Sequence, residues 1–193
     1  GEDKEEAEAR IDDLEAELRR RIGKYVFGMG KDTLEGVIGE LLKDEGLTVA
    51  TAESATGGLI GHRLTKIPGS SAYFWGGVIA YANEVKTRLL EVDEATLAGN
   101  GAVSEPVAGQ MARGVRQRLG THIGISTTGI AGPGGGSEEK PVGTVCIGFA
   151  MGEPNQAPNH VKTVRLQLTN DRKLNKELFA TSALEMIRRQ LIW

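Results

Sequence analysis

The stretch Thr51-Ala-Glu-Ser-Ala-Thr-Gly-Gly58 follows an apolar run, Leu47 to Ala50, and precedes a segment expected to be helical, Leu59 to Thr65. It therefore predicts the turn between a strand and a helix. The two glycines let backbone N–H groups approach a ligand, and the helix would direct its positive end at the same point, which suits an oxyanion or a phosphate. The alternative is a capped helix start, in which Ser54 or Thr56 accepts from the first helical N–H groups.

Two further segments place polar residues at strand ends. Tyr81-Ala-Asn-Glu-Val-Lys86 follows the strand-like run Phe74 to Ala80. If a helix opens at Asn83, Lys86 lies one turn below it and can point back toward Tyr81. The second segment, Thr127-Thr-Gly-Ile-Ala-Gly-Pro-Gly-Gly-Gly136, closes the apolar run Ile123 to Ile125. Its glycines and proline predict a shaped loop, with a flexible linker as the alternative.

The rest of the chain alternates between helical and strand-like patterns. Helices are expected over Gly1 to Arg21, Lys31 to Glu45, Asn83 to Glu91, Ser104 to Leu119, and from Asn170 to about Gln190. Strands are expected over 48–52, 75–81, 122–127, 142–150 and 160–168, and the short connection between the last two favours an antiparallel pair. This order predicts an α/β three-layer sandwich with a mixed β-sheet, preceded by an N-terminal amphipathic helix.

Composition excludes several classes of function. The 193-residue chain has a formal charge of −3, so it offers no basic field for duplex DNA, which disfavours a nucleic-acid partner although local basic patches remain open. Cys146 is the sole cysteine, which fits a reducing cytoplasm, and the histidines are too scattered for a metal cluster: His62, His122 and His160. The lack of a long apolar run and the acidic opening argue against a membrane span and a signal peptide. We expect a cytoplasmic protein that needs no metal and no cofactor.

Further motifs occur in a fixed order around these segments, namely Pro68-Gly-Ser-Ser71, Gly76-Gly-Val78, Gly101-Ala-Val-Ser104 and Lys140-Pro-Val-Gly-Thr-Val145. Together the motifs resemble the C-terminal domain of the CinA (competence/damage-inducible protein A) family, from about Leu34 to Leu191. Members of that family include nicotinamide-nucleotide amidohydrolases. One departure is Ala55, which stands where the family usually has Cys. A cysteine nucleophile would be lost here, whereas a Ser54 nucleophile survives.

The resemblance also implies a domain organisation. Full-length family members carry an upstream domain, so we expect the chain to be a C-terminal fragment. Residues 1–30 would then be an N-terminal helix and hinge that contacts another domain or subunit, and residues 31–193 would form the amidohydrolase domain.

The reaction implied by the resemblance is hydrolysis of nicotinamide mononucleotide, a step of pyridine nucleotide salvage, to nicotinate mononucleotide and ammonia. Ser54 is the expected nucleophile, and the amides from Ala55 to Gly58 would hold the oxyanion. Because no histidine lies near a site motif, Lys86 is the expected base. Neutral lysine at pH 7 costs about 4.6 kcal/mol unless the site lowers its pKa. An ionised Glu53 nearby would raise that pKa, so Glu53 should face away and hold loop N–H groups.

Other polar residues are expected to contact the substrate. Tyr81 could relay a proton or orient Lys86, or be an ordinary strand-end aromatic. Thr128 could bind the substrate or cap its turn, and Asn83 could touch the ligand or shape the turn before Lys86. Arg172 at a helix start suits a phosphate, with an ion pair to Asp171 or Glu177 as the alternative. The remaining expected contacts are Thr56, Gly57, Gly58, Gly129 and Gly132.

The sequence also allows an alternative function and indicates a partner. A non-catalytic nucleotide-sensing or docking module would need only the glycine loops and Arg172, whereas an NTPase is disfavoured because the P-loop ending is missing. The N-terminal helix carries a narrow apolar stripe of Ile11, Leu14, Leu18, Ile22 and Tyr25. An isolated helix of this length is marginal in water, so it should dock on its own domain or, as we favour, on a partner subunit of a homo-oligomer.

Overall fold

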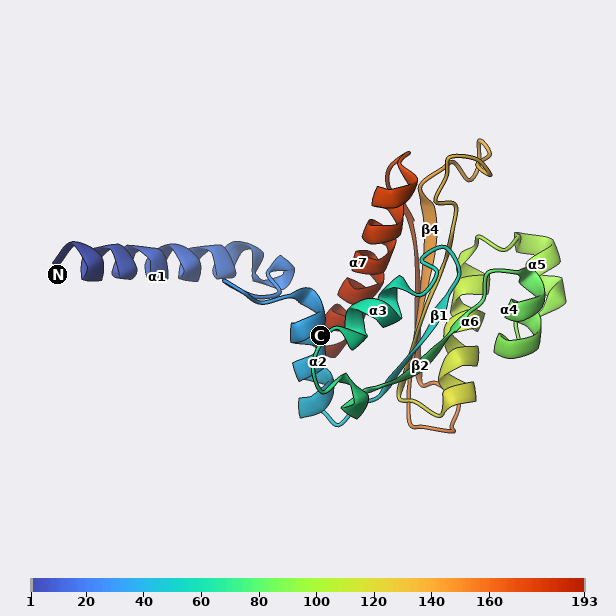
Figure 1. Cartoon of the computed structure of the whole chain (residues 1–193), viewed down its shortest axis with the longest axis horizontal. Coiled ribbons are helices and arrows are strands. Elements are labelled where there is room, and N and C mark those ends of the chain that lie inside the picture. Colours follow the sequence, from blue (N-terminus) through green and yellow to red (C-terminus); the bar gives the residue numbers. More distant parts are fainter. Residues whose placement is uncertain (1, 193) are drawn as a thin grey trace.

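The structure is a computed structural model that describes residues 2–192, and it shows one five-stranded sheet with helices on both faces (Figure 1). The strands lie in the order β2-β1-β3-β4-β5. Their bounds are β1 Val49–Glu53, β2 Phe74–Ile79, β3 Ile123–Gly129, β4 Thr144–Met151 and β5 His160–Gln167. β1 pairs in parallel with β2 and β3, whereas β4 runs antiparallel to both β3 and β5. The expected mixed sheet and three-layer α/β sandwich are confirmed.

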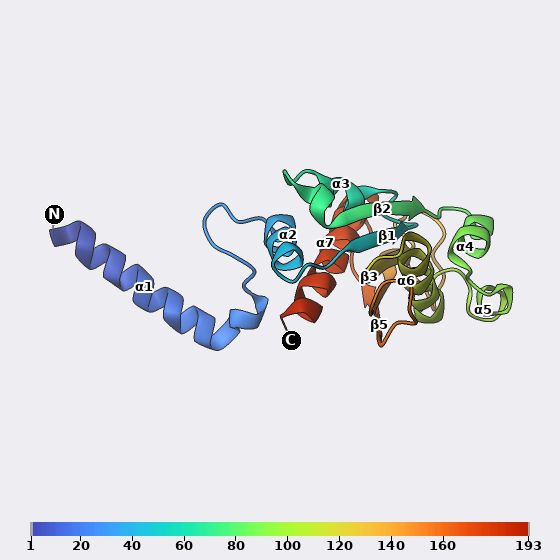
Figure 2. The same ribbon diagram turned by 90° about the horizontal axis from the view of Figure 1, so that it is seen from below.

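Each face of the sheet has its own group of helices (Figure 2). One layer consists of α2 (Leu34–Asp44), α3 (Leu59–Thr65) and α7 (Arg172–Leu191). The other consists of α4 (Asn83–Leu90), α5 (Glu94–Asn100) and α6 (Glu105–Leu119). Two separate groups of buried apolar side chains, one that includes Phe179 and one that includes Met111, fill the space under the two layers. The inner strand β1 is therefore buried along its whole length.

Helix α6 lies directly on the middle of the sheet because glycines leave room for its backbone. A Cβ atom at Gly124 of β3 would lie 2.0 Å from the carbonyl oxygen of Ala112, and one at Gly148 of β4 would lie 2.2 Å from that of Ala108. No side chain fits at either position. The buried hydroxyl of Ser126 uses the same close approach to donate to the Ala108 carbonyl at 2.6 Å.

Most elements expected from the sequence are present, and their ends differ by a few residues. The exception is α5, a seven-residue helix between α4 and α6 that the sequence analysis did not anticipate. It has no fully buried residue, so its sequence carries no apolar face that would predict a helix. The predicted Ser104 position before α6 is correct, but its hydroxyl donates to the Gly101 carbonyl instead of accepting from the helix.

The N-terminal helix α1 (Glu2–Ile22) extends away from the body (Figures 1 and 2). Its stripe is open to solvent, with Leu14 61% exposed and Ile22 45% exposed. Contact with the body begins after the helix, where Arg188 of α7 donates to the Lys24 carbonyl at 2.8 Å and the Arg189 guanidinium lies 5.2 Å from the centre of the Tyr25 ring. The part of the stripe on α1, from Ile11 to Ile22, therefore does not dock on its own domain, whereas Tyr25 contacts it. No helix within residues 2–192 is long and apolar enough to span a bilayer.

Candidate active site

The carboxyl ends of three parallel strands meet at one edge of the sheet. Ser54 follows β1 and donates its N–H to the Thr127 carbonyl of β3 at 2.9 Å, while Ala80 after β2 donates to the Glu53 carbonyl at 2.8 Å. The chain leaves β1 toward α3 on one face and leaves β2 toward α4 on the other. Open α/β sheets bind ligands where successive connections diverge in this way.

A cavity of about 200 Å³ opens at this edge, and we call it the Ser54 cavity. It brings together seven of the residues proposed from the sequence, which come from four separate segments of the chain. They are Ser54, Tyr81, Asn83, Lys86, Thr128, Gly129 and Arg172. The hydroxyl-bearing Ser54 is 8% exposed, whereas Tyr81 is 67% exposed at the rim. The cavity thus has a buried polar floor and an open mouth.

Lys86 is the most unusual residue of this cavity because its ammonium side chain is only 2% exposed. Asn83 begins α4 as expected, and Lys86 points back to donate to the carbonyls of Ala80 at 2.9 Å and Tyr81 at 3.3 Å. Burial lowers the pKa of Lys86, and the nearby charge of Glu84 opposes that shift. Desolvation disfavours the charged form, so the site favours a neutral amine more than water does.

Glu53 faces away from the Ser54 cavity and holds the following loop, as expected. Its carboxylate accepts from the Thr56 hydroxyl at 2.7 Å and from the N–H groups of Gly58, Ile60 and Gly61 at 2.9, 3.1 and 2.8 Å. The Thr56 hydroxyl also shares a 2.8 Å hydrogen bond with that of Thr127. The buried carboxylate therefore caps α3, which has no other side-chain cap.

This cap corrects one expectation from the sequence. Helix α3 does not direct its positive end at a ligand, because Glu53 already occupies the N–H groups of its first turn. Gly58 cannot offer its N–H to an oxyanion for the same reason. The N–H groups of Ala55, Thr56 and Gly57 are not among the partners of Glu53, and their role as oxyanion donors stays a prediction.

Thr128 and Arg172 are both held in place by backbone carbonyls. The Thr128 hydroxyl donates to the Ala102 carbonyl at 2.8 Å, which leaves its lone pairs for a ligand. Arg172 is the first residue of α7 and donates to the Gly132 carbonyl at 2.7 Å. Within residues 2–192 Arg172 has no salt bridge, so the expected alternative of an ion pair with Asp171 or Glu177 is wrong. Asp171 instead caps α7 through the Leu174 N–H.

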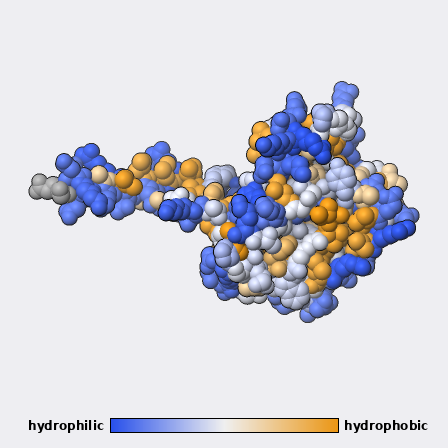
Figure 3. All heavy atoms as spheres, in the orientation of Figure 1, coloured by the Kyte–Doolittle hydropathy of each residue, from blue (hydrophilic) through white to orange (hydrophobic). Residues whose placement is uncertain are grey.

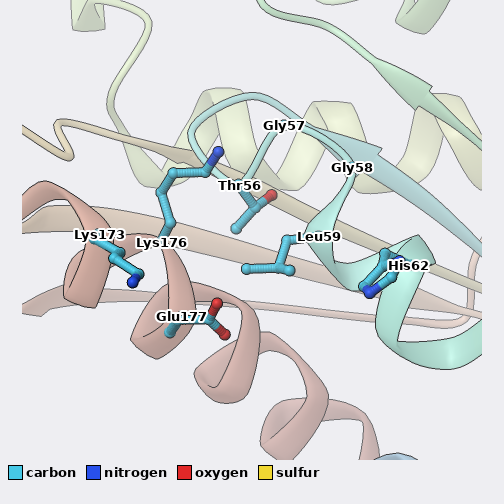
Figure 4. A pocket seen from close by; sticks show the side chains of 8 residues that line it. All are labelled: Thr56, Gly57, Gly58, Leu59, His62, Lys173, Lys176 and Glu177. Carbon is cyan, nitrogen blue, oxygen red and sulfur yellow. The ribbon is translucent and has the colours of Figure 1, made fainter. Parts of the chain in front are cut away.

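A second cavity of about 340 Å³ lies on the other side of the same loop, and we call it the Lys176 cavity (Figure 4). The loop contributes Thr56, Gly57 and Gly58, which the sequence had assigned to the same site as Ser54. Its other lining residues are Leu59, His62, Lys173, Lys176 and Glu177. Figure 4 shows Lys176 reaching from α7 toward Gly57. The structure therefore divides the predicted site residues between two cavities and leaves Gly132 as a support for Arg172.

Several residues of the two cavities were not anticipated. Ala102 and Val103 line the Ser54 cavity from the loop between α5 and α6. They belong to Gly101-Ala-Val-Ser104, a motif that was noted without a role, and apolar residues carry no chemical signal of a site. Lys173 and Lys176 were also missed because lysines on a helix surface usually mark a solvated face.

Comparison with known proteins shows the family of this chain. The model of the CinA C-terminal domain matches residues 31–191. The chain belongs to the CinA family. It is 55% identical over 185 residues to a "CinA-like protein" of Salinibacter ruber, covering 96% of this chain and 43% of that protein. A "putative competence-damage inducible protein" of Halothermothrix orenii is 49% identical and is covered to 45% of its length. The chain thus spans less than half of the length of these relatives.

Solved structures of CinA-family proteins have the same fold. The competence/damage inducible protein CihA of Agrobacterium tumefaciens superimposes with a TM-score of 0.76 at 36% identity, covering 86% of this chain and 99% of that one. A CinA superfamily protein of Klebsiella pneumoniae gives a TM-score of 0.76 at 30% identity, with 83% and 97% of the two chains covered. This CinA domain therefore covers these two solved chains almost completely.

Proposed function

We propose that this CinA domain hydrolyses the carboxamide of nicotinamide mononucleotide to nicotinate mononucleotide and ammonia with a Ser54–Lys86 centre. The observation that carries the proposal is the buried Lys86 amine, held at the cavity that also contains Ser54. A buried amine and a hydroxyl that line one cavity are the groups that nucleophilic amide hydrolysis needs. The activity itself is taken from the family resemblance, and no cofactor or metal enters the mechanism.

The hydrogen bonds of Lys86 support its role as the base. A neutral amine carries two N–H groups and one lone pair. Two carbonyl oxygens, those of Ala80 and Tyr81, accept from the Lys86 amine, so both N–H groups have partners. The lone pair is then left to accept the Ser54 proton as its oxygen attacks the carboxamide carbon. The Lys86 ammonium would give that proton to the carboxamide nitrogen as the C–N bond breaks, and the nitrogen would leave as ammonia. Water would then attack the acyl-enzyme, with Lys86 taking a proton from the water and returning it to the Ser54 oxygen.

Binding of the substrate assigns roles to the rest of the cavity. Arg172 supplies a cation without a salt-bridge partner within residues 2–192, and we assign it to the phosphate of the substrate. Thr128 and Asn83 would hydrogen-bond the carboxamide on the pyridine ring or the ribose. Tyr81 would cover the mouth of the cavity. The N–H groups of Ala55, Thr56 and Gly57 are the remaining candidates for the oxyanion.

The proposal is tested by following ammonia release from nicotinamide mononucleotide by the purified chain. We expect steady turnover that depends on enzyme concentration, with nicotinate mononucleotide as the second product. Free nicotinamide, which lacks the ribose phosphate, is the matched control and should be a much poorer substrate. Tight binding of the nucleotide without any release of ammonia would contradict the proposal and favour a nucleotide-sensing module.

A further inference from the structure

The Lys176 cavity is larger than the Ser54 cavity, and the proposed reaction uses none of its side chains. Its volume is about 340 Å³, against about 200 Å³ for the Ser54 cavity. Cavities that hold small organic ligands in proteins usually measure about 300 Å³ or more. The Lys176 cavity therefore has room for a small metabolite.

Two lysines of α7 give this cavity a positive side. Lys173 is exposed and Lys176 is half-buried, and within the described residues neither ammonium group forms a salt bridge. Lys173 and Glu177 are one helical turn apart, a spacing that allows an ion pair, yet none joins them. Figure 3 shows hydrophilic side chains gathered on the part of this face where the first turns of α7 lie in Figure 1. Both ammonium groups are thus available to an anion.

The buried Glu53 carboxylate does not account for these lysines. It does not line the Lys176 cavity, and it already accepts hydrogen bonds from the Thr56 hydroxyl and from N–H groups of the loop and of α3. A carboxylate with this many donors is satisfied without a cation. The positive charge of the cavity is therefore left for a ligand.

The loop adds a backbone donor beside Lys176. A Cβ atom at Gly57 would lie 3.6 Å from Lys176 Nζ, and Figure 4 shows the Lys176 side chain reaching toward Gly57. Within residues 2–192 the Gly57 N–H has no acceptor. An ammonium group and a backbone N–H are both donors that bind phosphate oxygens. If Gly57 donates to such a ligand, the N–H groups of Ala55 and Thr56 remain for the oxyanion of the reaction.

The rest of the lining differs from this positive side. Leu59 is apolar, and Figure 4 shows it between Lys176 and His62 in that view. The His62 imidazole can exchange hydrogen bonds with hydroxyl groups, and the Glu177 carboxylate can accept from them. Glu177 would also repel a second anionic group. The lining as a whole suits a ligand with one phosphate group and an uncharged, hydroxyl-bearing body.

We propose that the Lys176 cavity binds a small sugar phosphate, in addition to the substrate of the Ser54 cavity. Lys173, Lys176 and the Gly57 N–H hold the phosphate group. Glu177 accepts from a hydroxyl group of the sugar, whose carbon skeleton packs on Leu59. The proposal rests on this cavity alone and does not depend on amide hydrolysis. Its ligand would contact the loop that directly follows the proposed nucleophile.

Titration of the ¹⁵N-labelled chain with ribose 5-phosphate, followed by NMR, tests the site without any enzymatic readout. The amide signals of Gly57 and Leu59 report the Lys176 cavity, whereas that of Gly129 reports the Ser54 cavity. We expect saturable shifts at Gly57 and Leu59 with ribose 5-phosphate and none with ribose. Because the two cavities have separate signals, failure of this proposal is distinguishable from failure of the proposed function.

Three lysine variants assign the binding to the cavity. Lys176→Ala should raise the Kd read at Gly57 about 10-fold, since a charge-assisted hydrogen bond is lost. Lys173→Ala should also weaken binding, and its exposed position keeps this change away from the core. Lys31→Ala is the matched control, because Lys31 is exposed and lines neither cavity. It should leave the Kd unchanged, and circular dichroism establishes that each variant is folded.

Inorganic phosphate is the last probe, and we expect it to bind more weakly than ribose 5-phosphate because it leaves Leu59 and Glu177 without contacts. Equal affinity for the two probes would mean a site for free anions only and would overturn the proposal. The absence of a saturable shift at Gly57 would overturn it too. So would a Kd that is unchanged in both folded cavity variants, Lys173→Ala and Lys176→Ala.

Discussion

The Ser54 cavity and the Lys176 cavity share one loop but differ in how their lysines are held. Lys86 is 2% exposed and bonded to two backbone carbonyls, and burial lowers its pKa. Lys173 is exposed, and Lys176 is half-buried beside Gly57. Within the described residues neither of these two lysines forms a salt bridge. A pocket lined by cations can attract an anion, whereas acid–base catalysis uses a side chain whose pKa is shifted from its ordinary value. The comparison supports the proposal that catalysis takes place in the Ser54 cavity.

Ser54→Ala provides the largest expected effect. The change removes the proposed nucleophile, and we expect the kcat for ammonia release to fall at least about 10³-fold. The fold should be retained, because the hydrogen bond from residue 54 to Thr127 uses the backbone N–H. Steady-state kinetics and a thermal melt measure both quantities. Full activity in the folded variant would move the nucleophile out of the Ser54 cavity.

Lys86→Arg should be nearly as harmful, because a guanidinium does not lose its proton and cannot act as a base. We expect kcat to fall by about 10²- to 10⁴-fold. In the wild type kcat should rise with pH through the lowered pKa of Lys86, below the ordinary lysine value of 10.5. Lys86→Met, which avoids the larger guanidinium, should be equally inactive. A kcat that is independent of pH in the wild type would exclude a titrating lysine.

The same pKa shift links stability to pH. Between the lowered pKa of folded Lys86 and 10.5, the unfolded chain binds more protons than the folded chain. The contribution of Lys86 to the free energy of unfolding should therefore rise with pH across this window. Denaturant titrations of the wild type and Lys86→Met at several pH values measure it. The free energy of unfolding of the wild type relative to that of Lys86→Met should rise toward high pH, and a relative fall would contradict the assignment.

Glu53→Gln tests the loop that both cavities share. The amide nitrogen of Gln would face backbone N–H groups that now donate to a carboxylate oxygen. We expect the free energy of unfolding to fall by about 1–3 kcal/mol, since a buried donor loses its acceptor. Glu177→Gln in the exposed Lys176 cavity is the control and should change stability by less than about 0.5 kcal/mol. Equal effects from both changes would mean that Glu53 is not needed to hold the loop.

Arg172→Ala and Lys176→Ala compare the two cavities as phosphate sites. Loss of a charge-assisted hydrogen bond worth about 1.5–3 kcal/mol should raise the KM of Arg172→Ala about 10- to 100-fold, with kcat nearly unchanged. Lys176→Ala should change KM by less than about twofold if the phosphate lies in the Ser54 cavity. The reverse result, a large effect from Lys176 alone, would place the phosphate in the Lys176 cavity.

A chelator should have the smallest effect of all. Within residues 2–192 no group of three His, Cys, Asp or Glu side chains is placed to hold a metal ion. We therefore expect ammonia release to be unchanged after EDTA treatment and dialysis. Loss of activity that a divalent ion restores would show that the Ser54 cavity works through a different mechanism.

The sequence by itself determined the layers of this protein and the residues of its candidate centre. Alternating apolar runs specified the strands, and polar residues at the ends of β1, β2 and β3 specified Ser54, Tyr81 and Thr128, because parallel strands end at the same edge. Even the direction of Lys86 followed from the one-turn spacing after Asn83. These features are local, so the order of the residues is enough to predict them.

Only the tertiary structure decided how the neighbouring polar groups are divided. Glu53, Ser54, Thr56 and Gly57 are nearly adjacent in the chain, yet Glu53 caps α3, Ser54 faces one cavity and Gly57 faces the other. The lysines that line the second cavity come from α7, more than a hundred positions later in the sequence. These partners depend on how the helices pack on the sheet. Which acceptor each backbone N–H group binds is therefore decided only when those contacts form.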